Sequence, residues 1–284
     1  MILIDADPLV YGCGFAAQKS HSKIVVEDEA GNLFQDMTDD LGVWKREHKG
    51  YKVLEREVTV EAEPESYAIQ NIRLAISGIK AECVKAGYED PTVFYSAGGE
   101  LFRDRIATLL PYKGNRDKLH KPVHYAAIRD WLSRNDAIAV AGIETDDEIS
   151  IRGWDCLRAR QKCVVASIDK DLDQIPGKHY NPNTGKFYNV SRADAELWFW
   201  TQVLSGDSTD NIGGCWKVGS AGAAKLLSSV SPPYWPHVVK CYEESQGKAG
   251  CPYSNKDPSD VALENARLVY MLRNREESTK LWTP

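Results

Sequence analysis

The sequence contains no apolar run of about 18 residues, the length that a membrane-spanning helix requires. It also lacks the charged and then apolar N-terminal segment of a secretory signal, because Met1 leads directly into the strand-like Ile2, Leu3 and Ile4. We therefore expect neither export by such a signal nor a membrane partner.

Regularly spaced cysteines are also missing. The seven cysteines are odd in number and scattered, and none forms a Cys-x-x-Cys pair: Cys13, Cys83, Cys156, Cys163, Cys215, Cys241 and Cys251. This pattern predicts reduced thiols in a cytoplasm.

A basic net charge, the usual sign of a nucleic-acid partner, is missing as well, since the formal charge is −6. Eight of the 41 acidic residues, however, belong to the motifs described below, where metal ions could neutralise them. The rest of the chain is then slightly basic, so the net charge does not exclude nucleic acid. The length of 284 residues and the apolar content of 43% suit one large globular domain or two small ones.

The sequence Glu144-Thr145-Asp146-Asp147 places three carboxylates between an apolar run at 137–141 and a predicted helix that ends near residue 160. In open α/β sheets, ligands bind where a strand gives way to a helix. Acidic residues also stabilise the first turn of a helix, and for this stretch alone capping is the simpler interpretation. The rest of the chain favours a functional site.

Two further predicted strands, at 2–4 and 163–168, also lead into carboxylates, namely Asp5 and the pair Asp169 and Asp171. With a fourth strand at 92–95 and helices between the strands, the pattern predicts a mostly parallel sheet flanked by helices. Asp207 and Asp210 follow a predicted helix at 193–204. Carboxylates that converge on one sheet edge would raise one another's pKa unless cations lay among them, and oxygen ligands suit Mg²⁺ or Mn²⁺ better than zinc. Two such ions can support phosphodiester hydrolysis.

A basic segment at 112–121 and a glycine-rich segment at 213–225 suggest contacts with phosphate. The first combines a tyrosine with cations, which suits a nucleic-acid backbone, although a charge run is more often a solvated face. The second can expose backbone N–H groups to phosphate, but such a loop alone is a weak signal.

Taken in order, these motifs resemble the 5′ nuclease (flap endonuclease) superfamily, and most closely its phage T7-type 5′→3′ exonucleases. The similarity runs from residue 2 to about 228 and rests on Ile4-Asp5, Phe102-Arg103, Tyr112-Lys113-x-x-Arg116, Glu144-x-Asp146-Asp147, Asp169-x-Asp171, Gly206-Asp207-x-x-Asp210 and the glycine-rich segment. A Leu-Trp-x-Pro ending at 281–284 is also similar.

The resemblance implies an α/β, PIN-like fold with a C-terminal helix-turn-helix. Residues 1–204 would form the catalytic domain, with a β-rich insertion at about 20–62. Residues 205–284 would form a helical region whose helix-turn-helix, at 213–228, completes the active site and grips duplex DNA.

The resemblance also assigns residues to the site. Two Mg²⁺ or Mn²⁺ ions are implied, the first held by Asp5, Glu144, Asp146 and Asp147 and the second by Asp169, Asp171, Asp207 and Asp210. The implied catalytic residues are Lys113, Arg116 and Asp146, the first two at the scissile phosphate, and a K⁺ ion is implied at the helix-turn-helix. The implied nucleic-acid contacts are Arg103, Tyr112, Lys113, Arg116, Lys118, Lys121, Gly214, Lys217, Gly219, Gly222 and Lys225.

The implied activity is hydrolysis at the 5′ ends of duplex DNA, together with cleavage of 5′ flaps and of RNA in RNA–DNA hybrids. The implied setting is phage DNA replication in the host cytoplasm. The sequence does not indicate an oligomeric state.

One position departs from the family pattern, because Ser96 stands where an aspartate usually follows the second strand. Either Glu100 supplies the missing charge or the site works with one acid fewer. The second interpretation is therefore a catalytically weak nucleic-acid-binding protein. The third is a haloacid-dehalogenase-like phosphatase with Asp5 as nucleophile in Asp5-x-Asp7, but Pro8 does not suit that motif and the acids at 144–147 and 169–171 would then be unexplained.

Overall fold

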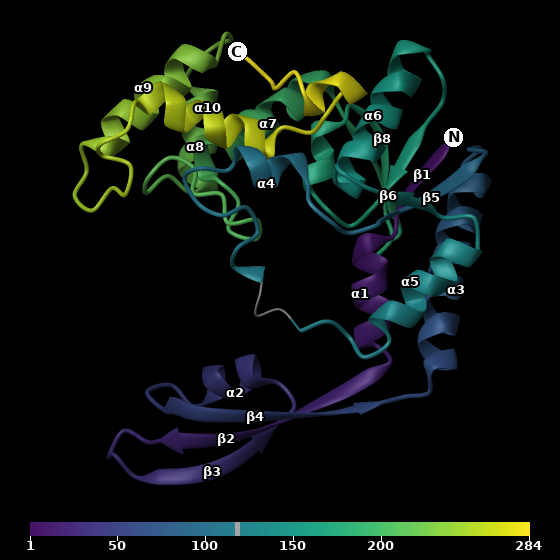
Figure 1. Ribbon diagram of the computed structural model, residues 1–284, viewed down its shortest axis with the longest axis vertical. Coiled ribbons are helices and arrows are strands. Elements are labelled where there is room, and N and C mark those ends of the chain that lie inside the picture. The colour runs from purple at the N-terminus through teal and green to yellow at the C-terminus, as the bar shows by residue number, and fades with distance from the viewer. Residues whose placement is uncertain (117–119) are drawn as a thin grey trace. The chain divides into compact units, whose positions relative to one another are not determined.

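The computed structural model describes residues 1–116 and 120–284, which form two compact units (Figure 1). The first unit comprises Met1–Pro8, Ser77–His120 and Asn135–Pro284, and the second comprises Leu9–Ile76 and Lys121–Arg134. Helix α3, Glu65–Lys85, belongs to both units. The predicted β-rich segment at 20–62 lies within the second unit, whereas the predicted domain boundary after residue 204 does not coincide with a boundary of either unit.

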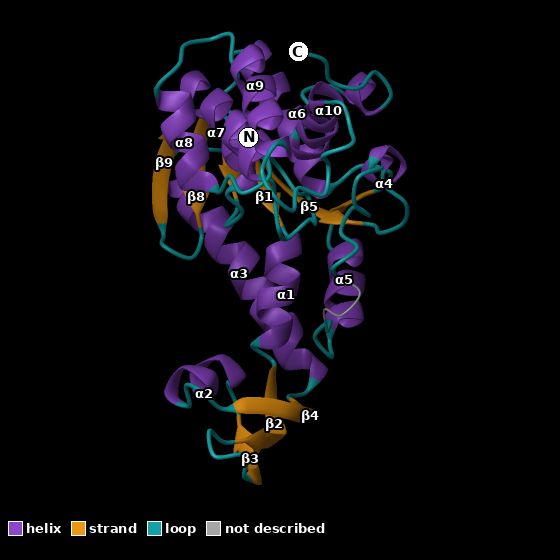
Figure 2. Cartoon of the chain, turned by 90° about the vertical axis from the view of Figure 1, so that its left-hand side faces the viewer, coloured by secondary structure: helices purple, strands orange, loops and turns teal. Residues whose placement is uncertain are grey.

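A six-stranded sheet organises the first unit, in the order β6-β5-β1-β7-β8-β9. Its strands are β1 Ile2–Asp5, β5 Pro91–Ser96, β6 Ile138–Val140, β7 Val164–Ala166, β8 Gly177–Asn181 and β9 Lys186–Val190. In this sheet the neighbouring strands β6, β5, β1, β7 and β8 all run parallel to one another. The edge strand β9 is antiparallel, because it forms a hairpin with β8. Figure 2 shows β8 and β9 on one side of β1 and β5 on the other. The prediction of a mostly parallel sheet is confirmed.

The apolar strands of this sheet are buried on both faces, as a parallel sheet requires. On one face Leu3, Phe94 and Val165 pack with Ile149 of helix α6, Thr145–Arg158. On the other face Ile4 is fully buried. Strand β1 pairs with β5 on one side and with β7 on the other. Strands β5 and β6 therefore extend the sheet in one direction from β1, and the later strands extend it in the opposite direction. In open α/β sheets, ligands bind at the point where the strand order reverses in this way.

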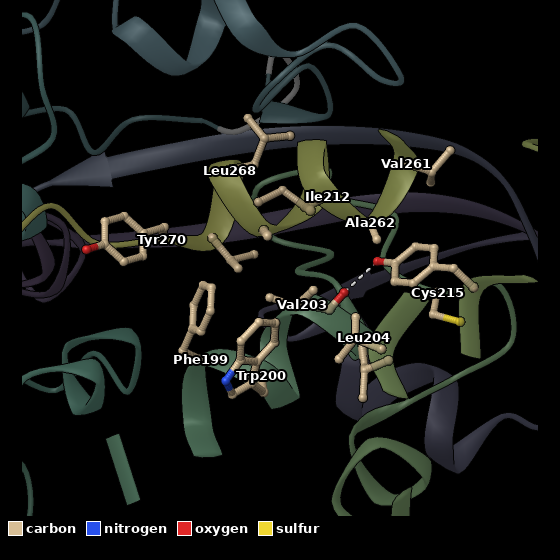
Figure 3. Close-up of a cluster of buried hydrophobic side chains, with 14 of the residues drawn as sticks. Phe199, Trp200, Val203, Leu204, Ile212, Cys215, Val261, Ala262, Leu268 and Tyr270 are labelled. Atoms are coloured by element: carbon tan, nitrogen blue, oxygen red, sulfur yellow. Dashed lines mark hydrogen bonds between the residues drawn. The ribbon is translucent and has the colours of Figure 1, made fainter. Parts of the chain in front are cut away.

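Four helices surround a second apolar core, shown in Figure 3, in which Phe199, Trp200 and Val203 pack against Leu268 and Tyr270. They are α7 Arg192–Ser205, α8 Ser220–Ser228, α9 Trp235–Gln246 and α10 Pro258–Val269. Within this core the Tyr242 hydroxyl donates a hydrogen bond of 2.6 Å to the carbonyl oxygen of Val203.

Side-chain contacts with the backbone fix the ends of two helices. Helix α4 spans only Phe102–Ile106, because the amides of Thr108 and Leu109 donate to the Glu264 carboxylate instead of continuing the helix. Helix α10 ends at Val269, where side chains bind the carbonyl groups of residues 268–270. The unit also contains the 3₁₀ helices η2 Asp171–Gln174 and η3 Arg275–Ser278.

The second unit contains an antiparallel sheet of order β3-β2-β4. Its elements are α1 Asp7–Phe15, which begins in the first unit, β2 Gln18–Glu27, β3 Leu33–Thr38, α2 Leu41–Glu47, β4 Lys52–Ala62, the start of α3, and α5 Tyr125–Arg134. Helix α2 packs on one face of the sheet, where Trp44 contacts Ile24 and Val26. In the described part of the chain, none of the helices has the length and apolar character needed to cross a bilayer.

Candidate active site

The first group of carboxylates lies at the end of β1 and the start of α6. The Asp5 side chain is 3% exposed and accepts hydrogen bonds from the Asp7 amide at 3.1 Å and the Ser167 hydroxyl at 2.8 Å. Burial, followed by the charge of Asp7, raises the pKa of Asp5 to about 7. Burial and the charges of Asp5 and Asp169 raise the pKa of Asp146 well above its ordinary value. The structure thus brings Asp5, Asp146 and Asp169 within electrostatic reach of one another.

The second group lies between η2 and the loop after α7. The Asp171 carboxylate accepts a 2.7 Å hydrogen bond from Gln202, and its amide donates one of 2.9 Å to Asp169. Burial and the charges of Asp169 and Asp207 raise the pKa of Asp171 to about 8. A cleft joins the two groups and is lined by acidic, amide, aromatic and apolar side chains, among them Glu144, Asp146, Asp171, Asp207, Asp210, Gln202 and Tyr112.

Among the described residues, basic side chains pair with one end of this acidic edge. Lys113 forms an ion pair with Glu144 and lies 3.6 Å from Asp210, which also pairs with Arg116. Burial alone would raise the pKa of Glu144, but Arg103 and Lys113 together lower it to about 2. Burial also disfavours the charge of Lys113, yet Glu144 and Asp210 outweigh this and raise the pKa of the ammonium. Glu144 and Lys113 are therefore both charged at neutral pH.

Tyr112 lies between the two acids that bind Lys113. Its hydroxyl is 2.7 Å from Glu144 Oε2 and 2.8 Å from Asp210 Oδ2. The phenolic proton can be donated to either carboxylate, so Tyr112 links the two acids. Burial raises the pKa of Asp210, although the charges of Lys113 and Arg116 oppose this shift. Tyr112 is 8% exposed, so it presents little surface to nucleic acid in this conformation, and its contact with nucleic acid stays a prediction.

Backbone contacts hold the segment that carries Lys113 against the loop of Asp207 and Asp210. The Lys113 amide donates to the Asp210 carbonyl at 2.9 Å, and the side-chain amide of Asn115 donates to the Ser208 carbonyl at 2.6 Å. In return, Asn211 donates to the Pro111 carbonyl at 2.8 Å. Lys113 has φ of +54°, a conformation that L-residues rarely adopt and that these contacts maintain.

Arg103 and Asp147 require a correction. Asp147 is fully buried and Arg103 is 3% exposed, and their side chains form a two-bonded ion pair at 2.5 and 2.9 Å. Arg103 also donates to the carbonyl groups of Leu268 and Tyr270, and its Nη1 lies 2.9 Å from Glu144. Asp147 therefore has no free oxygen for a metal, and Arg103 has no exposed donor for a phosphate. The pair instead anchors the first turn of α6, which carries Asp146.

Of the five residues of the glycine-rich segment that were predicted to contact nucleic acid, one is buried and four are exposed. The buried Gly214 donates its amide to Asn265 at 2.9 Å, so this amide is not available to phosphate. It lies so close to Gly206 that a Cβ atom on Gly214 would meet the Gly206 nitrogen at 2.3 Å, and both residues have positive φ. The other four residues are exposed before or within the first turns of α8: Lys217, Gly219, Gly222 and Lys225.

Two predicted cations lie elsewhere. Lys118 is outside the described residues. Lys121 belongs to the second unit, where its ammonium lies 4.8 Å from the centre of the Tyr125 ring.

The carboxylate that lies beside Ser96 belongs to Asp7. Glu100 is exposed and lies 3.8 Å from Arg105. The Asp7 carboxylate accepts hydrogen bonds from the Ser96 amide at 3.0 Å and from the Thr145 hydroxyl at 2.6 Å. Asp7 thus joins the ends of β1 and β5 to the start of α6.

Sequence reasoning did not find several residues that support the site. Gln174 and Gln202 are buried amides next to Asp171, and Asn115, Asn211 and Glu264 fix the segment around Lys113. Such residues carry no spacing signal, because Gln and Asn are ordinary surface residues of helices and loops.

The oxygen atoms of these carboxylates are suitable ligands for a hard cation, but their present positions do not form a metal site. Every charged ligand candidate is an oxygen donor, and the raised pKa values show mutual repulsion that a cation would relieve. Within residues 1–116 and 120–284, however, no three Asp, Glu, His or Cys side chains are arranged to hold a metal as they stand. Metal binding would therefore require some of these side chains to rotate towards one another.

In the absence of metal, we expect the free energy of unfolding to decrease as the pH rises from about 5 to about 8. Folded Asp5 and Asp171 keep their protons to about pH 7 and 8, whereas in the unfolded chain they lose them near pH 4. The unfolded state then binds fewer protons, so each group lowers stability by at most about 1.4 kcal/mol per pH unit. Urea denaturation at pH 5.5 and 8 measures this slope. The Asp171→Asn variant should reduce it, and a wild-type stability that rises with pH would contradict these protonation states.

No protein-family model matches the chain. Among curated proteins, DNA polymerase I of Pseudomonas aeruginosa is 28% identical over 154 residues, 49% of this chain and 16% of that protein. The exonuclease of Escherichia phage T7 is 30% identical over 108 residues, 36% of each chain. The 5′-3′ exonuclease of Buchnera aphidicola is 22% identical over 206 residues, 68% of this chain and 69% of that protein. These relatives confirm the resemblance to 5′ nucleases, although the match spans well under half of the first two.

Solved structures show the same fold. The phage T5 5′-exonuclease with bound zinc ions aligns with a TM-score of 0.56 and 15% identity, over 95% of this chain and 88% of that one. A phage T5 flap endonuclease in complex with DNA and metal ions aligns with a TM-score of 0.51 and 18% identity, over 69% of this chain and 80% of that one. The α/β architecture with a mostly parallel, helix-flanked sheet is thereby confirmed.

Proposed function

We propose that this chain is a metal-dependent 5′→3′ exodeoxyribonuclease that also cleaves 5′ flaps. The observation that carries the proposal is the meeting, at one edge of the sheet, of carboxylates with raised pKa and the protonated Lys113. Relatives named as exonucleases, and a similar fold described in complex with DNA and metal ions, support it. The sheet would then be the PIN-like catalytic part of the chain.

Seven of the eight carboxylates remain candidates for two metal ions. Asp5, Glu144 and Asp146 would serve the first ion, and the second would be held by Asp169, Asp171, Asp207 and Asp210. A bound Mg²⁺ or Mn²⁺ would lower the pKa of a water molecule and neutralise charge at the phosphodiester. Asp147 is no longer part of this proposal, because all its hydrogen-bonding capacity serves the protein.

Lys113 and Arg116 would receive the phosphate. Lys113 is one quarter exposed and Arg116 slightly more than one third, so both reach the solvent-facing side of the acidic edge. Since Lys113 stays protonated, it cannot act as a base at neutral pH. Its role is to donate a hydrogen bond and positive charge to a phosphate oxygen on which negative charge increases. Asp210 and Glu144 hold both cations in place until the phosphate arrives.

The loop before α8 and the first turns of this helix would grip the duplex. Gly219 and Gly222 expose backbone near the N-terminus of α8, and Lys217 and Lys225 add positive charge. Helix N-termini bind phosphate without reading bases. We assign residues 213–228, which comprise the glycine-rich loop and α8, to the helix-turn-helix, and we propose that this segment also binds a K⁺ ion.

We further propose that the chain acts in phage DNA replication and that RNA–DNA hybrids are substrates as well. The second candidate function, a catalytically weak nucleic-acid-binding protein, is favoured by Ser96, which leaves the end of β5 without a carboxylate. Asp7 beside Ser96 weighs against it, because this carboxylate restores the charge at that position.

A panel of 5′-labelled substrates tests the proposal. Blunt duplex, nicked duplex, 5′-flap DNA and RNA–DNA hybrid are incubated with Mg²⁺, Mn²⁺ or EDTA, and the products are resolved by length. Metal-dependent release of short 5′ products is expected. Tight binding of every substrate without cleavage would overturn the nuclease proposal in favour of the binding protein.

Replacing Lys113 by Met is expected to slow single-turnover cleavage by roughly 100- to 1,000-fold, the usual effect of removing one donor to developing charge. Glu144 keeps its contact with Arg103 in this variant, so the fold should survive. Lys256→Met, at an exposed lysine of the loop before α10, is the matched control and should cleave like the wild type. An unchanged rate in Lys113→Met would remove Lys113 from the proposed role.

A further inference from the structure

Five consecutive residues, Leu268 to Leu272, form a buried strap that begins in the last turn of α10 and continues beyond it; all five are less than 9% exposed. Three of their carbonyl groups and two of their amides bind side chains from other elements. Arg103 donates hydrogen bonds to the carbonyl groups of Leu268, at 2.8 Å, and Tyr270, at 2.7 Å. No chemical motif of the sequence marks this segment.

Gln174 makes the alternate contacts along the same strap. Its side-chain amide donates to the Val269 carbonyl at 2.7 Å, and its side-chain oxygen accepts from the Met271 amide at 3.3 Å. The Leu272 amide then donates to Asp147 at 3.2 Å. Along this short piece of backbone, contacts with the Arg103–Asp147 pair, which lies at the start of α6, therefore alternate with contacts with Gln174 of η2.

The η2 side continues to a carboxylate of the site. The second donor of Gln174 binds the Gln202 oxygen at 2.6 Å, and Gln202 donates to Asp171 at 2.7 Å. Gln174 and Gln202 are each 5% exposed, so these bonds are not exchanged for water. The direction of every bond is fixed: the strap orients Gln174, Gln174 orients Gln202, and Gln202 presents an N–H group to Asp171.

We propose that residues 268–272 are a positioning strap that holds the two carboxylate groups in register, through Arg103 and Asp147 on one side and through Gln174 and Gln202 on the other. The inference rests on the proposed function, because it gives these contacts a purpose in metal binding. Gln174 and Gln202 are positioning residues: Gln202 touches one carboxylate of the site, and Gln174 touches none.

Mn²⁺ binding to the full chain without DNA, measured by isothermal titration calorimetry, tests the strap apart from cleavage. Gln202→Met and Gln174→Met keep the volume but remove the bonds, and each is expected to weaken Mn²⁺ binding about 10- to 100-fold, as is usual for groups that orient metal ligands. Gln174→Glu keeps the oxygen that accepts from Met271 but lacks both donors, so it should weaken binding as well. Gln246→Met is the matched control: this glutamine lies at the end of α9, is partly buried and donates one hydrogen bond to the Lys256 carbonyl group.

Hydrogen exchange of the peptide that contains residues 268–272 gives a readout independent of metal. Gln174→Met should accelerate exchange of the Met271 and Leu272 amides at least tenfold, whereas Gln246→Met should not. Unchanged Mn²⁺ affinity in folded Gln174→Met, or unchanged exchange in the strap, would overturn the inference. Wild-type protein that neither binds Mn²⁺ nor cleaves DNA would overturn the proposed function instead, and the exchange experiment would still decide whether the strap is held by Gln174.

Discussion

Asp146→Asn is expected to lower the single-turnover rate of DNA cleavage by about 1,000-fold or more, with DNA affinity changed only a few-fold. Asp146 lies among Asp5, Asp169 and Glu144, whose charges raise its pKa after burial does. A carboxylate held among like charges destabilises the folded chain, so it is maintained for another reason. The variant should accordingly be more stable than the wild type in EDTA.

The stability gain provides the control for this prediction. Because the raised pKa keeps Asp146 protonated at low pH, the gain on substitution by Asn should be larger at pH 8 than at pH 5.5, on the order of 1 kcal/mol. Thermal unfolding at both pH values and quenched-flow cleavage measure the two effects. Full cleavage by a correctly folded Asp146→Asn variant would exclude this residue from the site.

Arg103→Met is expected to lower the free energy of unfolding by about 3–5 kcal/mol, because it leaves Asp147 buried and unpaired. The Leu268 and Tyr270 carbonyl groups lose their donors at the same time. Urea denaturation followed by circular dichroism measures the loss.

The double variant Arg103→Met with Asp147→Leu removes both charges and should recover a large part of the loss. Arg134→Met breaks an exposed ion pair with Asp130 and should cost less than about 1 kcal/mol. If Arg103→Met were as mild as Arg134→Met, the buried pair would not be the anchor of α6 that its geometry indicates.

The sheet and most of the carboxylates could be predicted because their signals are local. An apolar strand that leads into an acid, as at Ile4-Asp5 and Ile168-Asp169, places a carboxylate at the carboxyl end of a parallel strand. Strands of one parallel sheet end at one edge, so three such motifs predict a shared site before their pairing is known.

The division of labour among the acids could not be predicted. Asp146 and Asp147 are neighbours on α6, yet one faces the acidic group and the other a buried arginine. Helical geometry turns successive residues by about 100°, but which face meets Arg103 depends on long-range packing. The same holds for Gln174 and Gln202, whose bonds to residues 269 and 171 join segments far apart in the chain.

The central claim is that the carboxyl edge of this sheet binds divalent metal. The most direct test is a crystal of the protein grown or soaked with Mn²⁺, with data collected at the manganese absorption edge. The account predicts anomalous density between Asp5 and Asp146, or between Asp171 and Asp207, with these side chains rotated towards the ion. An active enzyme whose crystals show Mn²⁺ elsewhere, and none at this edge, would contradict it.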